Sequence, residues 1–230
     1  MPTTSISEPV VIAGGGPVGL TAGVRLGSLG VRVIVLEAED EPKTDWRAST
    51  FHCATLEVLE PTGIVPDMLA LGLQVPSYQL RDRSSGIVAE FEFSALGDET
   101  AYPYRLQLNQ QKVVGLLLER LKSLENVDLR FGRRLSGLSE HGSGVVARVT
   151  RGNGGSSGQG SEEEIEASFL IGADGAASTV RRCLGVGFSG STYPERFLIV
   201  SIEEDLSDRL DDLAYVNYVA DPVEWLFILR

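Results

Sequence analysis

The chain has 230 residues, 43% hydrophobic and 23% charged, which is ordinary globular composition and enough for one large domain or a domain with an appendage. Its 32 acidic residues outnumber the 20 basic ones and give a formal net charge of -12, so a nucleic-acid partner is not expected. A membrane partner is not expected either, because no run approaches the ~20 apolar residues that span a bilayer and residues 1–9 lack a signal-peptide pattern.

The N-terminal pattern predicts a βαβ unit. Residues 10–13 form a short apolar run, typical of a parallel strand buried on both faces, and they lead directly into a glycine-rich turn. Residues 18–29 carry apolar side chains at helical spacing and end at Gly30, a typical helix cap. Residues 31–36 are again β-branched and apolar, so a second parallel strand is expected there.

The middle of the chain predicts a separate sheet and then a return to the first one. After a helical stretch at 54–59, the runs 87–93 and 102–108 have β-like composition and are expected to belong to one antiparallel sheet. Residues 110–124 predict a long helix, and residues 127–131 predict another strand of the parallel sheet.

Three further runs predict a β-meander: residues 133–138, 144–150 and 162–167. A Gly/Ser-rich stretch, 152–161, joins the last two runs, and its composition predicts a mobile tip.

The C-terminal part is expected to add one more strand to the parallel sheet and then to continue outside it. Residues 169–171 predict a strand that runs into Gly-Ala-Asp-Gly and then a helix through Arg182. In the tail, residues 197–202 and 225–229 have strand-like composition.

The glycine pattern Gly14-x-Gly16-x-x-Gly19 lies between a predicted strand and a predicted helix. The first glycine allows a tight turn, the second lets the backbone approach a pyrophosphate, and the third lets the helix pack on the strand. The start of a helix attracts anions without any basic side chain, because its amide groups are unpaired. We therefore expect cofactor contacts from the segment Gly14, Gly15, Gly16, Pro17, Val18 and Gly19.

Glu37 follows Gly19 by 18 residues and ends the second predicted strand, where a carboxylate can bind both hydroxyls of an adenosine ribose. With Ala38 beside it, Glu37 favours FAD or NAD at this first site and disfavours the 2′-phosphate of NADP. The alternative is that Glu37 is a solvated residue opening the acidic loop 37–41.

Three motifs together resemble one family. These are the GGGPVGL turn with Glu37, the segment Asp-Trp-Arg-Ala-Ser-Thr at 45–50, and Gly-Ala-Asp-Gly-Ala-Ala-Ser-Thr-Val-Arg at 172–181. The chain is similar in them to class A flavin monooxygenases related to para-hydroxybenzoate hydroxylase. The last segment matches every fixed position of that family's Asp-Gly-x-x-Ser-x-x-Arg motif, and the three motifs span most of residues 9–182.

The resemblance implies roles for particular residues. Arg47 resembles the arginine that reaches the FAD phosphates, and Gln110 resembles the glutamine that contacts the flavin side of FAD. The Asp-Gly motif would close over the FAD pyrophosphate and take part in NAD(P)H use through Asp174, Gly175, Ser178 and Arg181. The alternatives are a surface pair between Arg47 and Asp45, and a helix N-cap for Asp174, which is compatible with a phosphate role.

The expected fold class is α/β: a Rossmann-type FAD-binding domain with a βαβ opening and a three-stranded β-meander, plus part of an antiparallel substrate-domain sheet. The FAD-binding domain is expected over 1–73 and 109–187, and the partial substrate domain over 74–108 and 188–230. The family's third FAD motif, a Gly-Asp after the Asp-Gly motif, is not found. The sequence therefore predicts a fragment, or a chain completed by a missing C-terminal segment or by another polypeptide. A homodimer is the other partner that stays open.

The resemblance implies an FAD-dependent monooxygenase that uses NADH or NADPH as reductant. Oxygen would add at the flavin C4a position, and the resulting hydroperoxide would hydroxylate a small aromatic or phenolic substrate. No catalytic side chain is identified. Two alternatives stay open, an FAD-binding module without turnover and a related flavin oxidoreductase of halogenase or geranylgeranyl-reductase type.

The remaining reactive residues receive structural interpretations. Cys53 and Cys183 have no CxxC spacing and no nearby His cluster, so neither a metal site nor a disulfide is expected, and a reducing cytoplasm fits. His52 and His141 receive no catalytic role. A further group is expected in the substrate-domain sheet, where aromatic side chains are more often core or sheet face than ligand contacts: Tyr78, Arg81, Tyr102, Tyr104, Tyr193, Tyr215 and Tyr218.

Overall fold

The computed structural model describes residues 8–42, 48–151, 162–210 and 212–230, and these fall into two compact units. The first unit comprises 1–48, 59–68 and 109–188, and the second comprises 49–58, 69–108 and 189–230. The predicted division into an FAD-binding and a substrate domain stays a prediction, because compactness alone does not assign a function to either unit.

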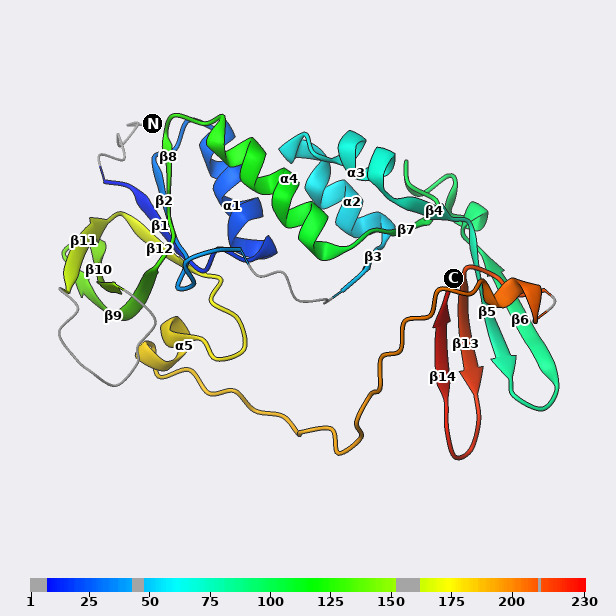
Figure 1. Cartoon of the computed structure of the whole chain (residues 1–230). Helices are drawn as coiled ribbons and strands as arrows, with labels where there is room; N and C mark the ends of the chain where they lie inside the picture. The colour runs from blue at the N-terminus through cyan, green and yellow to red at the C-terminus, as the bar shows by residue number, and fades with distance from the viewer. Residues whose placement is uncertain (1–7, 43–47, 152–161, 211) are drawn as a thin grey trace. The chain divides into compact units, whose positions relative to one another are not determined.

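The first unit is built on a four-stranded parallel sheet in the order β12-β1-β2-β8 (Figure 1). Its strands are β1 (Val10–Ala13), β2 (Val33–Leu36), β8 (Val127–Arg130) and β12 (Phe169–Gly172). Every residue of β1 and β2 is buried, as the continuous apolar runs predicted. Because β1 lies inside the sheet, the turn that follows it opens at the carboxyl edge between β12 and β2.

Helices α1 (Pro17–Ser28) and α4 (Gln110–Lys122) pack on one face of this sheet. Helix α1 ends as predicted, because Gly30 adopts a left-handed conformation with φ of 79°. Its amide donates to the carbonyl of Gly27, while the amide of Val31 donates to that of Leu26. These two bonds satisfy carbonyls that the helix end leaves unpaired.

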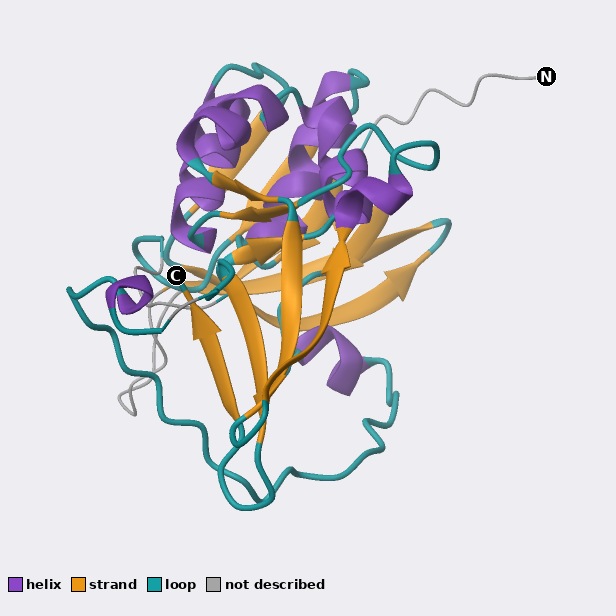
Figure 2. Ribbon diagram, turned by 90° about the vertical axis from the view of Figure 1, so that its right-hand side faces the viewer, coloured by secondary structure: helices purple, strands orange, loops and turns teal. Residues whose placement is uncertain are grey.

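The three-stranded meander covers the other face of the sheet (Figure 2). It consists of β9 (Arg133–His141), β10 (Gly144–Arg151) and β11 (Glu163–Ala167), and the predicted mobile tip between β10 and β11 lies outside the described residues. Alternate residues of the parallel sheet point to this side and form one apolar core with the meander and with Val180, which follows the Asp-Gly motif. The sheet and meander residues of this core are Val11, Ala13, Ile34, Leu36, Leu135, Ala147, Val149, Ile165 and Ala167.

The second unit holds two small sheets. One has the order β14-β13-β5-β6 and consists of β5 (Ser77–Asp82), β6 (Gly86–Glu92), β13 (Val216–Ala220) and β14 (Leu226–Leu229). The other has the order β3-β7-β4 and consists of β3 (Thr50–Phe51), β4 (Leu73–Val75) and β7 (Arg105–Gln107). The remaining helical segments are short: α2 (Cys53–Leu59), η1 (Glu60–Thr62), α3 (Val65–Leu71), η2 (Phe93–Leu96), α5 (Thr179–Cys183) and η3 (Leu206–Asp208).

Three details of the second unit differ from the sequence predictions. Residues 87–93 and 102–108 were expected in one sheet, but β6 and β7 belong to different sheets. The larger sheet is antiparallel within its two hairpins and parallel where β13 meets β5. The strand predicted at 197–202 is absent, because a strand needs a hydrogen-bonded neighbour and this run has none among the described residues.

No helix within the described ranges is long and apolar enough to cross a membrane.

Candidate dinucleotide-binding site

The glycine turn after β1 is packed too closely for side chains at two of its positions. Gly14 has φ of 110°, and a Cβ built on it would overlap the carbonyl of Ala173, which follows β12. A Cβ on Gly19 would overlap the carbonyl oxygen of Gly14 and approach Cγ2 of Ile12 to 3.3 Å. These glycines therefore let α1 and the Asp-Gly motif come directly against the end of β1.

The start of α1 is open at the same place. Gly16 is the N-cap residue, no side chain caps the helix, and the first turn contains no acidic residue. A Cβ on Gly16 would meet nothing within 4 Å. The unpaired amides and the positive end of the helix dipole can therefore receive an anion at this point.

Glu37 lies beside the glycine turn, at the end of β2. One carboxylate oxygen accepts a hydrogen bond from the amide of Gly15 at 2.8 Å, and the other accepts one from the amide of Glu39 at 2.9 Å. An ionised carboxylate offers about four lone-pair sites, so further acceptor capacity remains. The carboxylate holds the turn and the following loop, and it can also accept bonds from a diol.

The Asp-Gly motif forms a closed hydrogen-bond network. The Asp174 carboxylate accepts from the hydroxyl of Ser178 at 2.6 Å and from the amides of Thr179 and Val180 at 2.6 and 3.1 Å. Ser178 is the N-cap residue of α5, where its hydroxyl accepts from the amide of Arg181 at 2.9 Å. Asp174 was expected as the N-cap residue, but Ser178 occupies that position. Asp174 takes part in the capping by accepting from the first helical amides.

Replacing Asp174 with alanine is expected to lower the free energy of unfolding by about 1 to 2 kcal/mol, because two helix amides and one hydroxyl lose their acceptor. Urea denaturation measures this change. The matched control is Asp128→Ala, which removes an exposed carboxylate of β8 with a surface ion pair and should cost less than about 1 kcal/mol. An Asp174 variant as stable as the control would contradict the capping role.

A cavity of about 500 Å³ lies at this edge of the sheet, within the first unit. Most of the predicted site residues line it: Gly14, Gly15, Gly16, Pro17, Val18, Glu37, Ala38, Gln110, Asp174 and Gly175. Gly19 is buried behind the turn, and neither Ser178 nor Arg181 lines the cavity. The Arg181 guanidinium instead donates to the carbonyl of Ala176 and lies 4.5 Å from the Phe188 ring centroid. Arg47 lies outside the described residues.

Other lining residues carried no sequence signal. The cavity wall includes two arginines at the start of β9, Arg133 and Arg134, together with Val114 from the inner part of α4. Their residue types are ordinary for a strand start and a helix, and only the packing of α4 and the meander around the turn brings them to the cavity.

Among the residues that the structure describes, no group of three His, Cys, Asp or Glu side chains is arranged to hold a metal ion.

A parallel βαβ unit with a close-packed glycine turn, an uncapped helix start and a carboxylate on the second strand is the arrangement of dinucleotide-binding α/β proteins. The family model described as FAD binding domain matches residues 7–223. This chain therefore belongs to the FAD binding domain family.

The individual relatives are monooxygenases by name. The para-nitrophenol 4-monooxygenase of Pseudomonas sp. (strain WBC-3) is 32% identical over 97% of this chain and 53% of its own length. The 6-hydroxy-3-succinoylpyridine 3-monooxygenase HspB of Pseudomonas putida (strain DSM 28022 / S16) is 36% identical over 90% of this chain and 51% of its own. The chain thus spans about half the length of these curated relatives.

Solved structures of monooxygenases also match this chain. The crystal structure of p-nitrophenol 4-monooxygenase PnpA from Pseudomonas putida DLL-E4 matches with a TM-score of 0.84 and 31% identity, covering 96% of this chain and 54% of that one. The flavin-dependent monooxygenase PieE, solved with FAD and substrate, matches with a TM-score of 0.75 and 26% identity, covering 97% and 40%. The predicted fold class and the resemblance to class A flavin monooxygenases are confirmed.

The residues present fit the dinucleotide part of FAD. The open space at Gly16 is where a pyrophosphate needs to approach the backbone, and the uncapped start of α1 faces it. Glu37 lines the same cavity with acceptor capacity left for a ribose.

Proposed function

We propose that this chain binds FAD in the cavity beside the glycine turn and takes part in the hydroxylation of a small aromatic substrate. The observation that carries the proposal is the position of Glu37 beside an uncapped helix start, in a cavity that the Asp-Gly motif also lines. Family membership identifies the dinucleotide as FAD.

Each part of the cofactor has a proposed partner. The backbone amides at the start of α1 hold the pyrophosphate, and the Glu37 carboxylate accepts hydrogen bonds from the adenosine ribose. By family resemblance, Arg47 contacts the phosphates, Gln110 contacts the flavin side, and the Asp174 segment closes over the pyrophosphate. The cavity position of Gln110, at the first residue of α4, supports its assignment.

Bound FAD would supply the redox chemistry, with NADH or NADPH as reductant and O2 as oxidant. The described residues contribute binding and orientation, and no catalytic side chain is assigned. The aromatic substrate class rests on the names of the relatives, which include enzymes for para-nitrophenol and 3-(3-hydroxy-phenyl)propionate. A cytoplasmic location is proposed because Cys53 and Cys183 are both free thiols.

Flavin titration tests the proposal. Purified chain should quench the fluorescence of FAD on binding, and it should bind FAD at least about tenfold more tightly than FMN, which lacks the AMP half and with it the pyrophosphate. Equal affinity for FAD and FMN, or no binding of FAD, would contradict the proposed site. Oxidation of NADH or NADPH that a phenol stimulates would separate a complete monooxygenase from an FAD-binding module without turnover.

A further inference from the structure

The second unit buries a positive charge that no carboxylate neutralises. The side chain of Arg105, on β7, is 5% exposed, and among the described residues it forms no ion pair. Its guanidinium donates to the hydroxyl of Tyr218 at 3.0 Å and to Oγ1 of Thr50 at 3.2 Å, which are both neutral groups. Its Nε is buried without a hydrogen-bond partner among the described residues.

An unpaired buried cation is costly, since burial removes the hydration of the charge and neutral partners compensate only part of that loss. The chain contains 32 acidic residues, so the lack of an acidic partner here does not follow from composition. The uncompensated charge also affects His52, whose pKa is lowered by partial burial and, second, by the Arg105 guanidinium. The surroundings of Arg105 therefore favour a negatively charged group.

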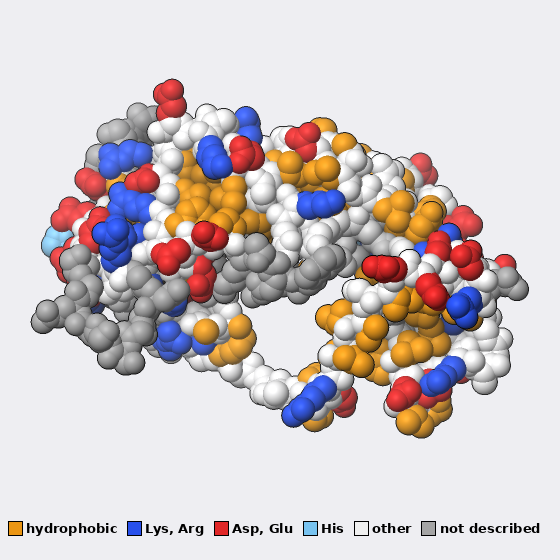
Figure 3. Space-filling view, viewed as in Figure 1, with side chains coloured by type: hydrophobic (Ala, Val, Ile, Leu, Met, Phe, Trp, Pro, Cys, Tyr) orange, Lys and Arg blue, Asp and Glu red, His pale blue; other side chains and the backbone are white. Residues whose placement is uncertain are grey.

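Aromatic rings lie beside this charge on one face of the larger sheet. We call Tyr78, Phe91, Tyr218 and Phe227 the aromatic face. The Tyr78 ring lies 5.0 Å from Phe91 and 5.9 Å from Tyr218, and Tyr218 lies 4.8 Å from Phe227. Phe91, Tyr218 and Phe227 are exposed, and Figure 3 shows hydrophobic side chains gathered over β13 and β14. Exposed rings of this kind can pack against a further aromatic ring.

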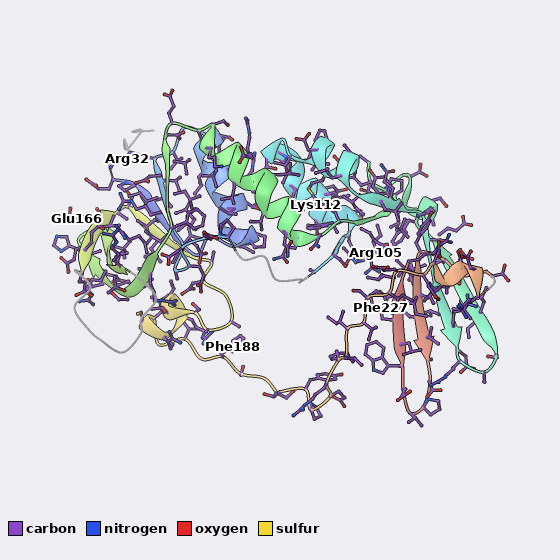
Figure 4. All side chains as sticks on the ribbon, viewed as in Figure 1. Arg32, Arg105, Lys112, Glu166, Phe188 and Phe227 are labelled. Atoms are coloured by element: carbon purple, nitrogen blue, oxygen red, sulfur yellow. The ribbon has the colours of Figure 1, made fainter. Side chains whose placement is uncertain are left out.

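The charge and the rings meet at Phe227. The Arg105 guanidinium lies 5.7 Å from the centroid of the Phe227 ring, and Figure 4 shows the two labelled side chains close together where β7 reaches the β13–β14 hairpin. Gln107, two residues along β7 and so on the same face, has a buried Oε1 without a hydrogen-bond partner among the described residues. A donor hydroxyl on a ligand would satisfy this oxygen.

We propose that Arg105 and the aromatic face form a subsite for an aromatic ring that carries an oxyanion, a phenolate or a ring carboxylate. The inference rests on the proposed function and deepens it, because it specifies the ionisation state in which the aromatic substrate is recognised. The anion pairs with the guanidinium, and the ring packs on Phe227 and Tyr218.

Two pairs of probes of matched shape test the charge preference by equilibrium dialysis at a pH where the acid is ionised. The pairs are 4-nitrophenolate against 4-nitroanisole, and benzoate against benzamide. In at least one pair, the anion is expected to bind about tenfold more tightly than the neutral partner. A preference in the nitrophenolate pair indicates a phenolate site, and a preference in the benzoate pair indicates a carboxylate site. Equal affinities within both pairs, or no binding of any probe, would overturn the proposal.

Variants then assign the preference to one residue. Arg105→Met should lower the affinity for the anionic probe about tenfold and leave the affinity for the neutral probe unchanged. Arg105→Lys should keep part of the preference for the anion. The matched control, Arg83→Met, removes an exposed cation of the same unit and should change neither. An anion preference that survives in Arg105→Met would overturn the assignment. Should that variant fail to fold, an undiminished preference in Arg105→Lys would do so.

FAD titration of the same proteins separates this inference from the proposed function. Wild type and Arg105→Met are expected to bind FAD equally, because Arg105 belongs to the second unit and the dinucleotide cavity to the first. Loss of FAD binding in both, with the anion preference intact, would count against the proposed function alone. FAD binding without any anion preference would count against the Arg105 subsite alone.

Discussion

Alanine at Gly19 is expected to lower the free energy of unfolding by about 3 kcal/mol. The added methyl group would overlap the carbonyl oxygen of Gly14, which is backbone and cannot rotate away as a flexible side chain could. Relief requires that α1 move away from β1, at the centre of the parallel sheet where Val11 and Ile12 are fully buried. Urea denaturation followed by circular dichroism measures the loss.

Alanine at two other glycines shows whether the loss of stability in Gly19→Ala comes from the steric overlap or from replacing any glycine with alanine. Gly115 lies on the exposed side of α4, where a Cβ would meet nothing within 4 Å. Gly115→Ala should therefore raise the free energy of unfolding by up to about 1 kcal/mol. Gly16→Ala also meets nothing within 4 Å, so it should fold like wild type, but its methyl group occupies the space proposed for the pyrophosphate. FAD affinity should therefore fall by about tenfold or more in Gly16→Ala. Unchanged FAD affinity there would contradict the proposed pyrophosphate position.

The first unit could largely be predicted because its signals are local. A continuous apolar run at 10–13, a glycine turn, a helix capped by Gly30 and a second apolar run specify a βαβ unit within a short stretch of chain, and the structure has each element there. The meander was equally readable, since its strands pair with their sequence neighbours. Local patterns suffice where neighbours in sequence are neighbours in space.

The second unit could not be predicted as well, because its pairings are distant in sequence. Strand β13 aligns Asn217 with Gln79 of β5, and no pattern in either run indicates the other as its partner. The run 197–202 has the composition of a strand and forms none, since composition records what a residue tolerates and not whether a neighbouring strand is present.

The candidate site divides in the same way. Glu37 and the glycines were identified because dinucleotide binding requires a particular spacing, and the structure places Glu37, Gly14 and Gly16 around one cavity. Arg133 and Arg134 reach that cavity through the packing of the meander, which their sequence context does not reveal. Arg105 is a stronger case, because a cation within a strand-like run is expected to be solvated, and only the tertiary structure shows that it is buried.

Replacing Glu37 with alanine is expected to weaken FAD binding by about 1 to 3 kcal/mol, the cost of losing hydrogen bonds to the ribose in a partly buried site. The substitution also removes the acceptor for the amides of Gly15 and Glu39, so some loss of affinity could come from a loosened turn. Glu41→Ala controls for charge, since it removes an exposed carboxylate from the same acidic loop and should leave FAD affinity unchanged.

A ligand lacking one hydroxyl distinguishes the ribose contact from the loosened turn. Wild type should bind ADP about 1 kcal/mol more tightly than 2′-deoxy-ADP, because the Glu37 carboxylate loses one hydrogen bond to the deoxy sugar. If Glu37 binds the ribose, Glu37→Ala should bind ADP and 2′-deoxy-ADP equally. The preference for ADP in wild type minus the preference in Glu37→Ala then gives the coupling free energy between Glu37 and the 2′-hydroxyl. If the variant keeps the full preference for ADP, another group recognises the 2′-hydroxyl, and the proposed hydrogen bond from this hydroxyl to Glu37 is wrong.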